Sequence, residues 1–206
     1  MRTLWLASSS PRRRLLMENS GFQPRCVSSD LDDDLLRIND ENVLATCAAR
    51  AWFKAESVHD QLLSRADSDT GDDPGILVAA DTLCELDGSP VGKPATKNDA
   101  EFMIRSMIAR AHRTVTGVAI LDRSSMERSI WCDVARVELG ALSEDALHAY
   151  LESGEWRGKS GGYNLGDRIN AGWPVSCHGD PATVMGLPMK RLAPALKLFM
   201  KEGASS

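Results

Sequence analysis

Short apolar runs alternate along the chain with longer amphipathic stretches. Apolar or alternating runs predict strands at 4–7, 25–28, 76–80, 83–86, 113–122 and 129–139. Helical periodicity predicts helices at 11–20, about 41–59, 98–109, about 143–152, and a last apolar helix that ends near residue 201. Because strands and helices take turns along the chain, the pattern predicts an α/β fold, a single domain over 1–206 with two lobes.

Some segments carry a more specific expectation. The pair Asp87-Gly88 between two strand-like runs predicts a hairpin turn. The polar, acidic stretch 64–75 predicts a flexible loop, and the glycine-rich stretch 158–167 predicts irregular structure. One face of the helix at 98–109 is expected to be buried, because apolar residues recur there: Phe102, Met103, Ile104, Met107 and Ile108.

Composition narrows the class of protein. The 206 residues are 43% hydrophobic and 26% charged, with a net charge of −5, so the chain has no general field to attract nucleic acid or an anionic membrane surface. No apolar stretch approaches the roughly 20 residues of a membrane span, and serines and arginines come too early for a signal peptide. Five scattered cysteines without a CxxC pair predict reduced thiols and a cytoplasmic location.

The segment after the first predicted strand has the chemistry of an anion site. Pro11 stands where a helix takes its first residue, and the serines before it, Ser8 among them, are cap residues. Arg12 and Arg13 then lie in the first turn, where a positive charge opposes the helix dipole. That local cost, together with the unpaired N–H groups of a helix N-terminus, favours a polyanionic ligand such as a phosphate.

Other polar residues could act on that phosphate. Asp81 follows a buried strand and is a candidate base or metal ligand, and Lys54 and Lys93 are candidate phosphate clamps. On composition alone, Lys54 is better explained as an ordinary exposed lysine. A carboxylate cluster fits either a metal site or a solvated acidic turn: Asp30, Asp32, Asp33 and Asp34. The sequence contains no GxxxxGK[ST] and no GxSxG, which excludes a P-loop and makes a serine triad a poor explanation.

These residues stand in stretches that resemble, nearly end to end, the Maf family of nucleoside triphosphate pyrophosphatases. The matching stretches are LASSSPRRRLL, SDLDD, ARAWFKAESV, AADTLCELDGSPVGKP, TVTGVAI, YLESGEWRGKSGGY and GDPATVMGLPMKRL. The resemblance implies hydrolysis between the α- and β-phosphates of a nucleotide, with a divalent cation (Mg²⁺, Mn²⁺ or Co²⁺). It also implies an elongated fold around a mixed twisted sheet, similar to inosine triphosphatase, with a cleft between two lobes, and a possible homodimer.

The resemblance assigns roles to particular residues. The family's proton acceptor falls on Asp81, its two lysines on Lys54 and Lys93, and its metal-associated acidic residue on Asp33, where relatives often carry glutamate. Asp81 is the second expected metal ligand. The residues expected to bind substrate are Ser8, Arg12, Arg13, Thr82 and Asn164.

Base specificity and turnover stay open in the sequence. Arg12 and Thr82 look like the branch of the family that acts on dTTP and UTP, but the glutamine expected after Tyr163 is absent. Asn164 and Asp167 are the candidates to replace it, since an amide or a carboxylate can recognise a base edge. The alternative function is a nucleotide-binding regulator of cell division or septum formation that binds without turnover.

Overall fold

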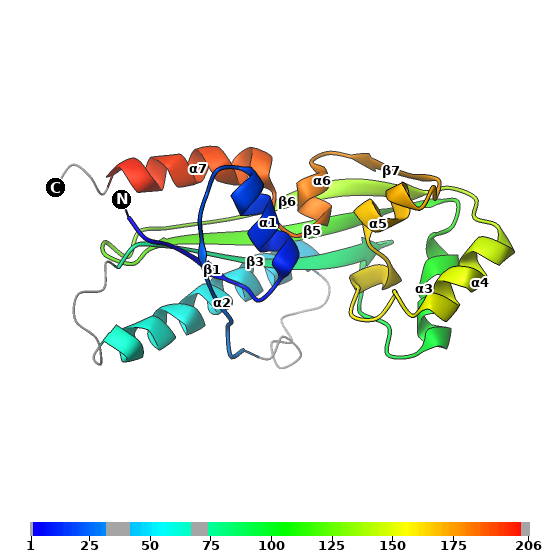
Figure 1. Ribbon diagram of the computed structural model, residues 1–206, viewed down its shortest axis with the longest axis horizontal. Coiled ribbons are helices and arrows are strands. Elements are labelled where there is room, and N and C mark those ends of the chain that lie inside the picture. Colours follow the sequence, from blue (N-terminus) through cyan, green and yellow to red (C-terminus); the bar gives the residue numbers. More distant parts are fainter. Residues whose placement is uncertain (1, 32–41, 67–73, 203–206) are drawn as a thin grey trace.

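The computed structural model describes residues 2–31, 42–66 and 74–202 (Figure 1). Its strands are β1 (Leu4–Ala7), β2 (Arg25–Val27), β3 (Ile76–Leu86), β4 (Ser89–Val91), β5 (Arg110–Asp122), β6 (Arg128–Leu139) and β7 (Val175–His178). Its helices are α1 (Pro11–Asn19), α2 (Val43–Ala66), α3 (Lys97–Met107), α4 (Glu144–Ser153), the 3-10 turn η1 (Ser160–Gly162), α5 (Leu165–Asn170), α6 (Pro181–Val184) and α7 (Met189–Glu202).

All the described strands join one mixed sheet in the order β2-β1-β3-β5-β6-β7, with β4 paired to β3. The β2–β1 and β1–β3 pairs are parallel, and the remaining pairs are antiparallel. Figure 1 shows the long strands β3, β5 and β6 running along an elongated molecule, with α1, α2 and α7 around one end and α3, α4 and α5 at the other. The predicted α/β class, mixed sheet and two lobes are confirmed.

The end of the molecule with α1, α2 and α7 is the first lobe, and the end with α3, α4 and α5 is the second. In the first lobe the sheet is covered on both faces. Side chains alternate along a strand, so Val78 and Ala80 of β3 pack with α1 and α7, whereas Leu77 and Ala79 pack with α2. Coverage on both sides explains why β1 is a continuous apolar run whose four residues are all buried. The same alternation directs the next two side chains of β3, Asp81 and Thr82, to opposite faces.

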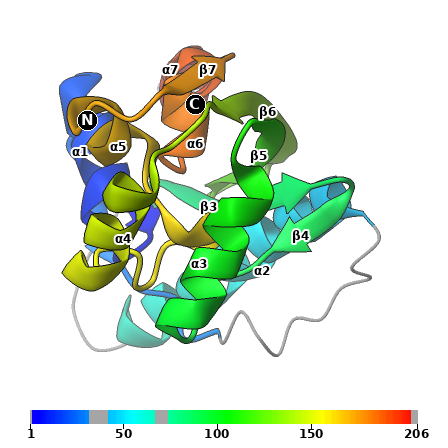
Figure 2. The same cartoon turned by 90° about the vertical axis from the view of Figure 1, so that its right-hand side faces the viewer.

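The second lobe has its own core around α3 and α4. Figure 2 shows this end of the molecule facing the viewer. Ala100, Ile104 and Met107 form the buried face of α3, and Met103 packs partly buried beside them. The expectation that Phe102 belongs to this face is wrong, because its side chain is 76% exposed. A period of 3.6 residues places position 102 on the far side of a helix whose buried positions are 100, 104 and 107.

Some boundaries differ from those expected. β3 runs unbroken from 76 to 86, where two strands were predicted. α2 continues to Ala66 instead of ending near 59, so the predicted loop at 64–75 starts inside that helix, and residues 67–73 lie outside the described part of the chain. The stretch 158–167, predicted to be irregular, contains η1 and the start of α5. The Asn164 side chain accepts a hydrogen bond from the Asp167 N–H and so caps this short helix.

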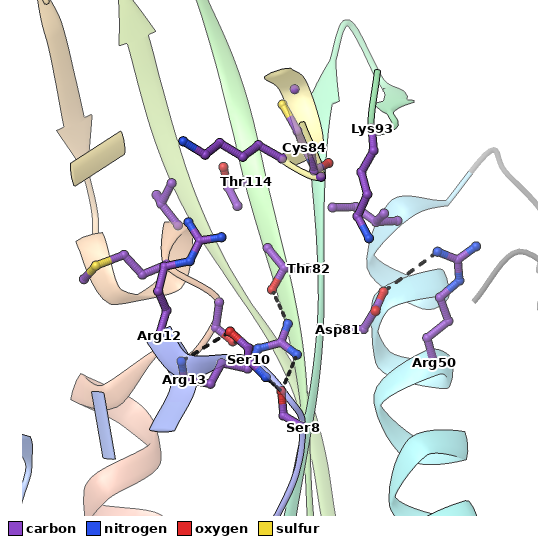
Figure 3. Close-up of a pocket in the computed structure, with 18 of the residues that line it drawn as sticks. Ser8, Ser10, Arg12, Arg13, Arg50, Asp81, Thr82, Cys84, Lys93 and Thr114 are labelled. Atoms are coloured by element: carbon purple, nitrogen blue, oxygen red, sulfur yellow. Dashed lines mark hydrogen bonds and ion pairs between the residues drawn. The ribbon is translucent and has the colours of Figure 1, made fainter. Parts of the chain in front are cut away.

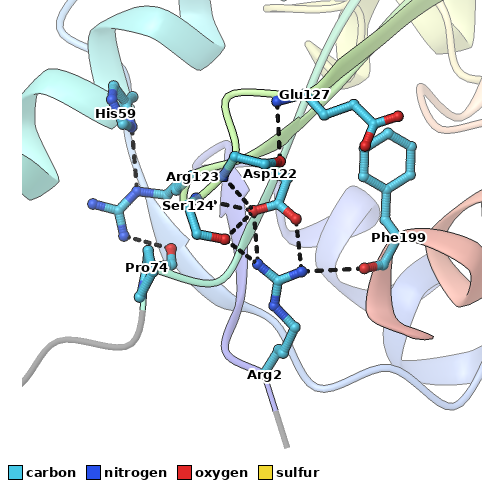
Figure 4. Close-up of polar contacts among 9 residues, drawn as sticks. Arg2, His59, Pro74, Asp122, Arg123, Ser124, Glu127 and Phe199 are labelled. Carbon is cyan, nitrogen blue, oxygen red and sulfur yellow. Dashed lines mark hydrogen bonds and ion pairs between the residues drawn. The ribbon is translucent and has the colours of Figure 1, made fainter. Parts of the chain in front are cut away.

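The end of the molecule away from α3 and α4 is fastened by an ion pair (Figure 4). Both terminal nitrogens of Arg2 donate to the carboxylate of Asp122 at 2.7 Å, and Arg2 also donates to the Phe199 carbonyl of α7. The Arg2 guanidinium, with help from the Ser124 hydroxyl, holds the pKa of Asp122 well below its usual range. These contacts join the segment before β1 to β5 and α7. No described helix is both long and apolar enough to cross a bilayer.

Candidate active site

The site is organised by an opening in the edge of β3. β5 pairs with β3 from Ile76 to Glu85 along one edge. On the other edge, β1 pairs with Ile76–Ala79 and β4 with Cys84–Leu86. Within the described residues, Ala80–Leu83 therefore have no neighbouring strand on that edge. Side chains from both faces of the sheet meet at this opening.

The position of Asp81 corrects the sequence prediction in one respect. It lies inside β3, not at its end. Asp81 is nevertheless two residues beyond Ala79, the last residue of β3 that pairs with β1, so it stands where the parallel part of the sheet ends. Ligand sites of α/β proteins gather at that kind of edge.

A cavity of about 980 Å³ surrounds the opening and takes walls from both lobes. It confirms the predicted cleft between the lobes. Of its described lining residues one is acidic, Asp81, while the basic ones are Arg12, Arg13, Arg50, Lys54, Lys93 and Lys159. This local excess of positive charge in a chain of net charge −5 suits a small polyanion.

The N-terminus of α1 forms one wall, as the sequence predicts. Ser10 is the N-cap, Pro11 is the first helical residue, and the Ser8 hydroxyl accepts a hydrogen bond from the Ser10 N–H at 3.2 Å. Arg12 is exposed and lines the cavity. Arg13 instead donates through Nε to the Gly186 carbonyl at 2.8 Å and through a terminal nitrogen to the Thr82 hydroxyl at 3.1 Å.

Thr82 belongs to a directed chain of hydrogen bonds. Thr116, which is fully buried, donates its single hydroxyl proton to the Thr183 carbonyl at 2.8 Å. Its oxygen lies 2.8 Å from the Thr82 hydroxyl, so Thr82 is the donor in that pair and accepts from Arg13. These hydrogen bonds fix the Arg13 guanidinium against the sheet.

Thr116 and Gly186 were not singled out from the sequence, although both stand in stretches that carry the family resemblance. Gly186 has a φ of +101°, and a Cβ there would lie 3.0 Å from Nε of Arg13. A glycine is therefore required for Arg13 to approach the backbone so closely.

On the opposite face of β3, Asp81 meets two cations of α2. Lys54 Nζ donates to Oδ1 at 2.6 Å, which places this lysine in the cleft and excludes the ordinary exposed lysine. Arg50, one turn earlier on α2, lies 4.0 Å from Oδ2 and was not predicted as a site residue. Figure 3 shows Arg13 and Thr82 on one side of β3, and Asp81 and Arg50 on the other.

Lys93 reaches the same cavity from the segment after β4, and Figure 3 shows its side chain extending toward the level of Asp81. The backbone before it is held because the Gly92 carbonyl accepts a hydrogen bond from the Gly161 N–H at 3.0 Å. Pro94 after it is buried. The backbone on both sides of Lys93 is therefore restrained.

The second-lobe end of the cavity is lined by Asn164, Tyr163 and His112. Asn164 Oδ1 caps α5, so its amide nitrogen is the group it can present to a ligand. Asp167, the other candidate for base recognition, lies outside the lining and pairs with Lys159 at 3.1 Å. The Tyr163 hydroxyl lies 2.9 Å from Nε2 of His112, and burial lowers the pKa of that imidazole to about 4.

The carboxylate of Asp81 fits a divalent cation. Its Oδ2 is buried and has no hydrogen-bond partner in the described part of the chain, which is a state that a hard cation or a water molecule would satisfy. The residues described include no group of three or more acidic, cysteine or histidine side chains placed to hold a metal. Mg²⁺ is commonly held by one or two carboxylates together with substrate phosphates, so one described carboxylate is compatible with it. The predicted ligand Asp33, with Asp32 and Asp34, lies outside the described residues; Asp30 is exposed and does not line the cavity.

Comparison with known proteins identifies the family. The family model described as Maf-like protein matches residues 3–199. A protein named dTTP/UTP pyrophosphatase from Desulforamulus reducens is 30% identical over 199 residues, 97% of each chain. A protein of the same name from Pyrococcus abyssi is 32% identical over 198 residues, 95% of this chain and 96% of the relative. A solved HAM1 protein from Coxiella burnetii has a TM-score of 0.42 and 16% identity, covering 68% of this chain and 73% of that one. With a family model matched over nearly its whole length, the chain belongs to the Maf-like protein family.

Proposed function

We propose that this chain is a nucleoside triphosphate pyrophosphatase that acts on the pyrimidine nucleotides dTTP and UTP. It would cleave the α–β phosphoanhydride to give a nucleoside monophosphate and pyrophosphate. The names of the relatives support this activity. The observation that carries it is the pairing of one carboxylate, Asp81, with Lys54 on one side of β3, across the opening from Arg13 on the other side.

The reaction needs a nucleophile and a leaving group on opposite sides of the attacked phosphorus. We assign the nucleophile side to Asp81, whose carboxylate accepts a proton as a water oxygen bonds to the α-phosphorus. The bond from that phosphorus to the bridging oxygen breaks, and pyrophosphate leaves with the electron pair. Ser8, Arg12 and Arg13 at the N-terminus of α1 then receive the pyrophosphate charge, and Lys93 at the border of the opening faces the transferred phosphate.

A divalent cation, Mg²⁺, Mn²⁺ or Co²⁺, belongs to this proposal. Asp81 Oδ2 and, from the family resemblance, Asp33 would hold it, with phosphate oxygens of the substrate as further ligands. When bound, it would neutralise phosphate charge that develops in the transition state.

The second-lobe end of the cavity is the proposed base subsite. The Asn164 side-chain nitrogen is a donor that suits the carbonyl oxygens of uracil and thymine. A cytoplasmic enzyme fits its five cysteines, all of which are free thiols. A homodimer stays a prediction from the family resemblance, to be checked by sedimentation.

The test is release of pyrophosphate from UTP, dTTP, CTP, GTP and 7-methyl-GTP with each of the three cations. Asp81→Asn is expected to lose turnover by about 10³-fold while it keeps affinity for UTP. Asp87→Asn, on the exposed hairpin between β3 and β4, is the matched control. In H₂¹⁸O the label is expected in the monophosphate. A folded protein without turnover on the whole panel would support the nucleotide-binding regulator instead.

A further inference from the structure

Two rings that share a hydrogen bond stand at the second-lobe end of the cavity. The Tyr163 hydroxyl lies 2.9 Å from Nε2 of His112, and the rings meet edge to face with their centroids 5.8 Å apart. Both residues line the cavity at the proposed base subsite. Either atom of the pair is able to donate, so the direction of this hydrogen bond decides what the hydroxyl offers to a ligand.

Burial determines how many protons the two rings hold. His112 is only 5% exposed, and burial lowers its pKa to about 4. At neutral pH its imidazole is therefore uncharged and carries one proton, on either Nδ1 or Nε2. Burial also raises the pKa of Tyr163 above its ordinary value, so the hydroxyl keeps its proton. Two arrangements of these protons are possible.

The second nitrogen of His112 distinguishes the two arrangements. If the Tyr163 hydroxyl donated to Nε2, the imidazole proton would sit on Nδ1. That nitrogen is buried and has no hydrogen-bond partner in the described part of the chain, so a buried N–H would be left unpaired. Buried N–H groups without an acceptor are rare in proteins, and buried acceptors without a donor are less so. The favoured arrangement places the proton on Nε2, which donates to the Tyr163 oxygen.

This arrangement leaves the hydroxyl proton of Tyr163 for a ligand. Among the residues that the structure describes, its hydroxyl has His112 as its hydrogen-bond partner, and His112 then acts as the donor. Uracil and thymine have a carbonyl oxygen at position 4 of the base, where cytosine has an amino group. A hydroxyl proton suits the carbonyl oxygen and opposes the amino group.

We propose that Tyr163 is a specificity-determining residue that donates its hydroxyl proton to the 4-carbonyl oxygen of uracil or thymine, and that His112 is the positioning residue that sets this direction. The inference rests on the proposed function and deepens it. The reverse hydrogen bond would present a lone pair of the same hydroxyl and would suit the amino group of cytosine. The preference for UTP and dTTP over CTP thus depends on which nitrogen of His112 carries the proton.

The first experiment compares kcat/KM for pyrophosphate release from UTP and from CTP. Tyr163→Phe removes only the hydroxyl, and it is expected to lower kcat/KM for UTP about tenfold while that for CTP stays within about twofold. Tyr150→Phe is the matched control. It removes the hydroxyl of the other tyrosine of the chain, which donates to the Gly162 carbonyl at 2.9 Å and does not line this cavity. Its ratio of UTP to CTP turnover should equal that of the unchanged protein.

The second experiment tests the positioning role of His112. His112→Phe removes the donor and should lower the UTP to CTP ratio about threefold or more. In His112→Gln the amide nitrogen can donate to the same oxygen, so part of the ratio should return. A purely structural role would change both nucleotides alike. Nitrogen-15 NMR of the labelled imidazole, with the signal identified by its loss in His112→Gln, should show the proton on Nε2.

Three results would overturn the inference. They are a proton on Nδ1, an equal loss for UTP and CTP in Tyr163→Phe, or an unchanged ratio in that variant. Thermal unfolding shows whether each variant is folded, and the NMR measurement on the unchanged protein decides the direction of the hydrogen bond if Tyr163→Phe is not. Failure of the proposed function has a different signature, because the unchanged protein would then release no pyrophosphate from any nucleotide while its imidazole proton still sat on Nε2.

Discussion

Replacing Gly186 by alanine tests how the cleft positions Arg13. The new Cβ would lie 3.0 Å from Nε and 3.4 Å from a terminal nitrogen of Arg13, and 3.3 Å from the Thr82 hydroxyl. These distances are shorter than comfortable contacts, and the backbone of Gly186 is itself fixed by hydrogen bonds of the α6 turn. The Arg13 guanidinium and the Thr82 hydroxyl must therefore shift by a few tenths of an ångström, which weakens the hydrogen bonds that hold Arg13.

The largest effect on activity follows from complete loss of one of these hydrogen bonds. Arg13 donates to the Gly186 carbonyl at 2.8 Å and to Thr82 at 3.1 Å, and hydrogen bonds of a charged donor contribute about 1.5–3 kcal/mol each. Loss of one such bond in the substrate complex lowers kcat/KM by about 10- to 100-fold. Alanine at a φ of +101° also costs roughly 1–2 kcal/mol of folding free energy.

A matched control separates displacement from strain. Gly21 has a φ of +84°, and a Cβ there meets nothing within 4 Å. Gly21→Ala should lose a similar amount of stability in urea unfolding and keep its kcat/KM for pyrophosphate release from UTP. If Gly186→Ala and Gly21→Ala show the same kinetics, Arg13 does not bind substrate from the position described.

Two further substitutions test the polar groups of the sheet. Thr82→Val removes the hydroxyl that accepts from Arg13 and should lower kcat/KM for UTP about tenfold. Thr82→Ser keeps the hydroxyl, so its kcat/KM should stay within about threefold of the unchanged protein. Equal kinetics of the two variants would contradict the hydrogen-bond chain. His112 is the second test, because burial lowers its pKa from 6.5 to about 4 in the folded protein. Between these two pKa values the unfolded chain binds more protons than the folded protein. The free energy of unfolding is therefore highest above pH 6.5 and decreases as the pH falls through this range. Between pH 7.5 and pH 5 the decrease amounts to about 2 kcal/mol of unfolding free energy, which urea titrations of His112→Gln should no longer show. The same pH dependence in both proteins would refute this.

Local signals predicted the part of the site that depends on local structure. Ser10 as the N-cap and Pro11 as the first helical residue are neighbours in the sequence and mark where α1 begins, and the structure has that helix. The Asp87-Gly88 turn likewise depends on its own backbone preferences. By contrast, two strands were expected between 76 and 86 because the polar pair Asp81-Thr82 interrupts the apolar run.

The polar side chains of Asp81 and Thr82 have hydrogen-bond partners that are far away in the sequence. Lys54 pairs with Asp81 from 27 residues away, and Thr116 pairs with Thr82 from 34 residues away. Similarly, Arg50 looks like any arginine of an amphipathic helix until the register of α2 against β3 is known. Position 186 requires a glycine because Arg13, 173 residues earlier in the sequence, approaches its backbone. Such residues are defined by tertiary contacts that local periodicity does not encode.

The adjacency of Asp81 and Thr82 has a geometric consequence for catalysis. Consecutive side chains of a strand point to opposite faces, so two neighbouring residues reach two sides of the same sheet. In most sheets the flanking strands would keep those sides apart, but among the residues that the structure describes no strand covers the edge of Ala80–Leu83 between β1 and β4. In the proposed reaction, a phosphoanhydride that spans this edge would meet the carboxylate on one face and Arg13 on the other. In-line displacement requires that opposition, and a single strand register supplies it. Inserting one residue between Asp81 and Thr82 would bring both to one face, and turnover should be lost even though every side chain of the site is retained.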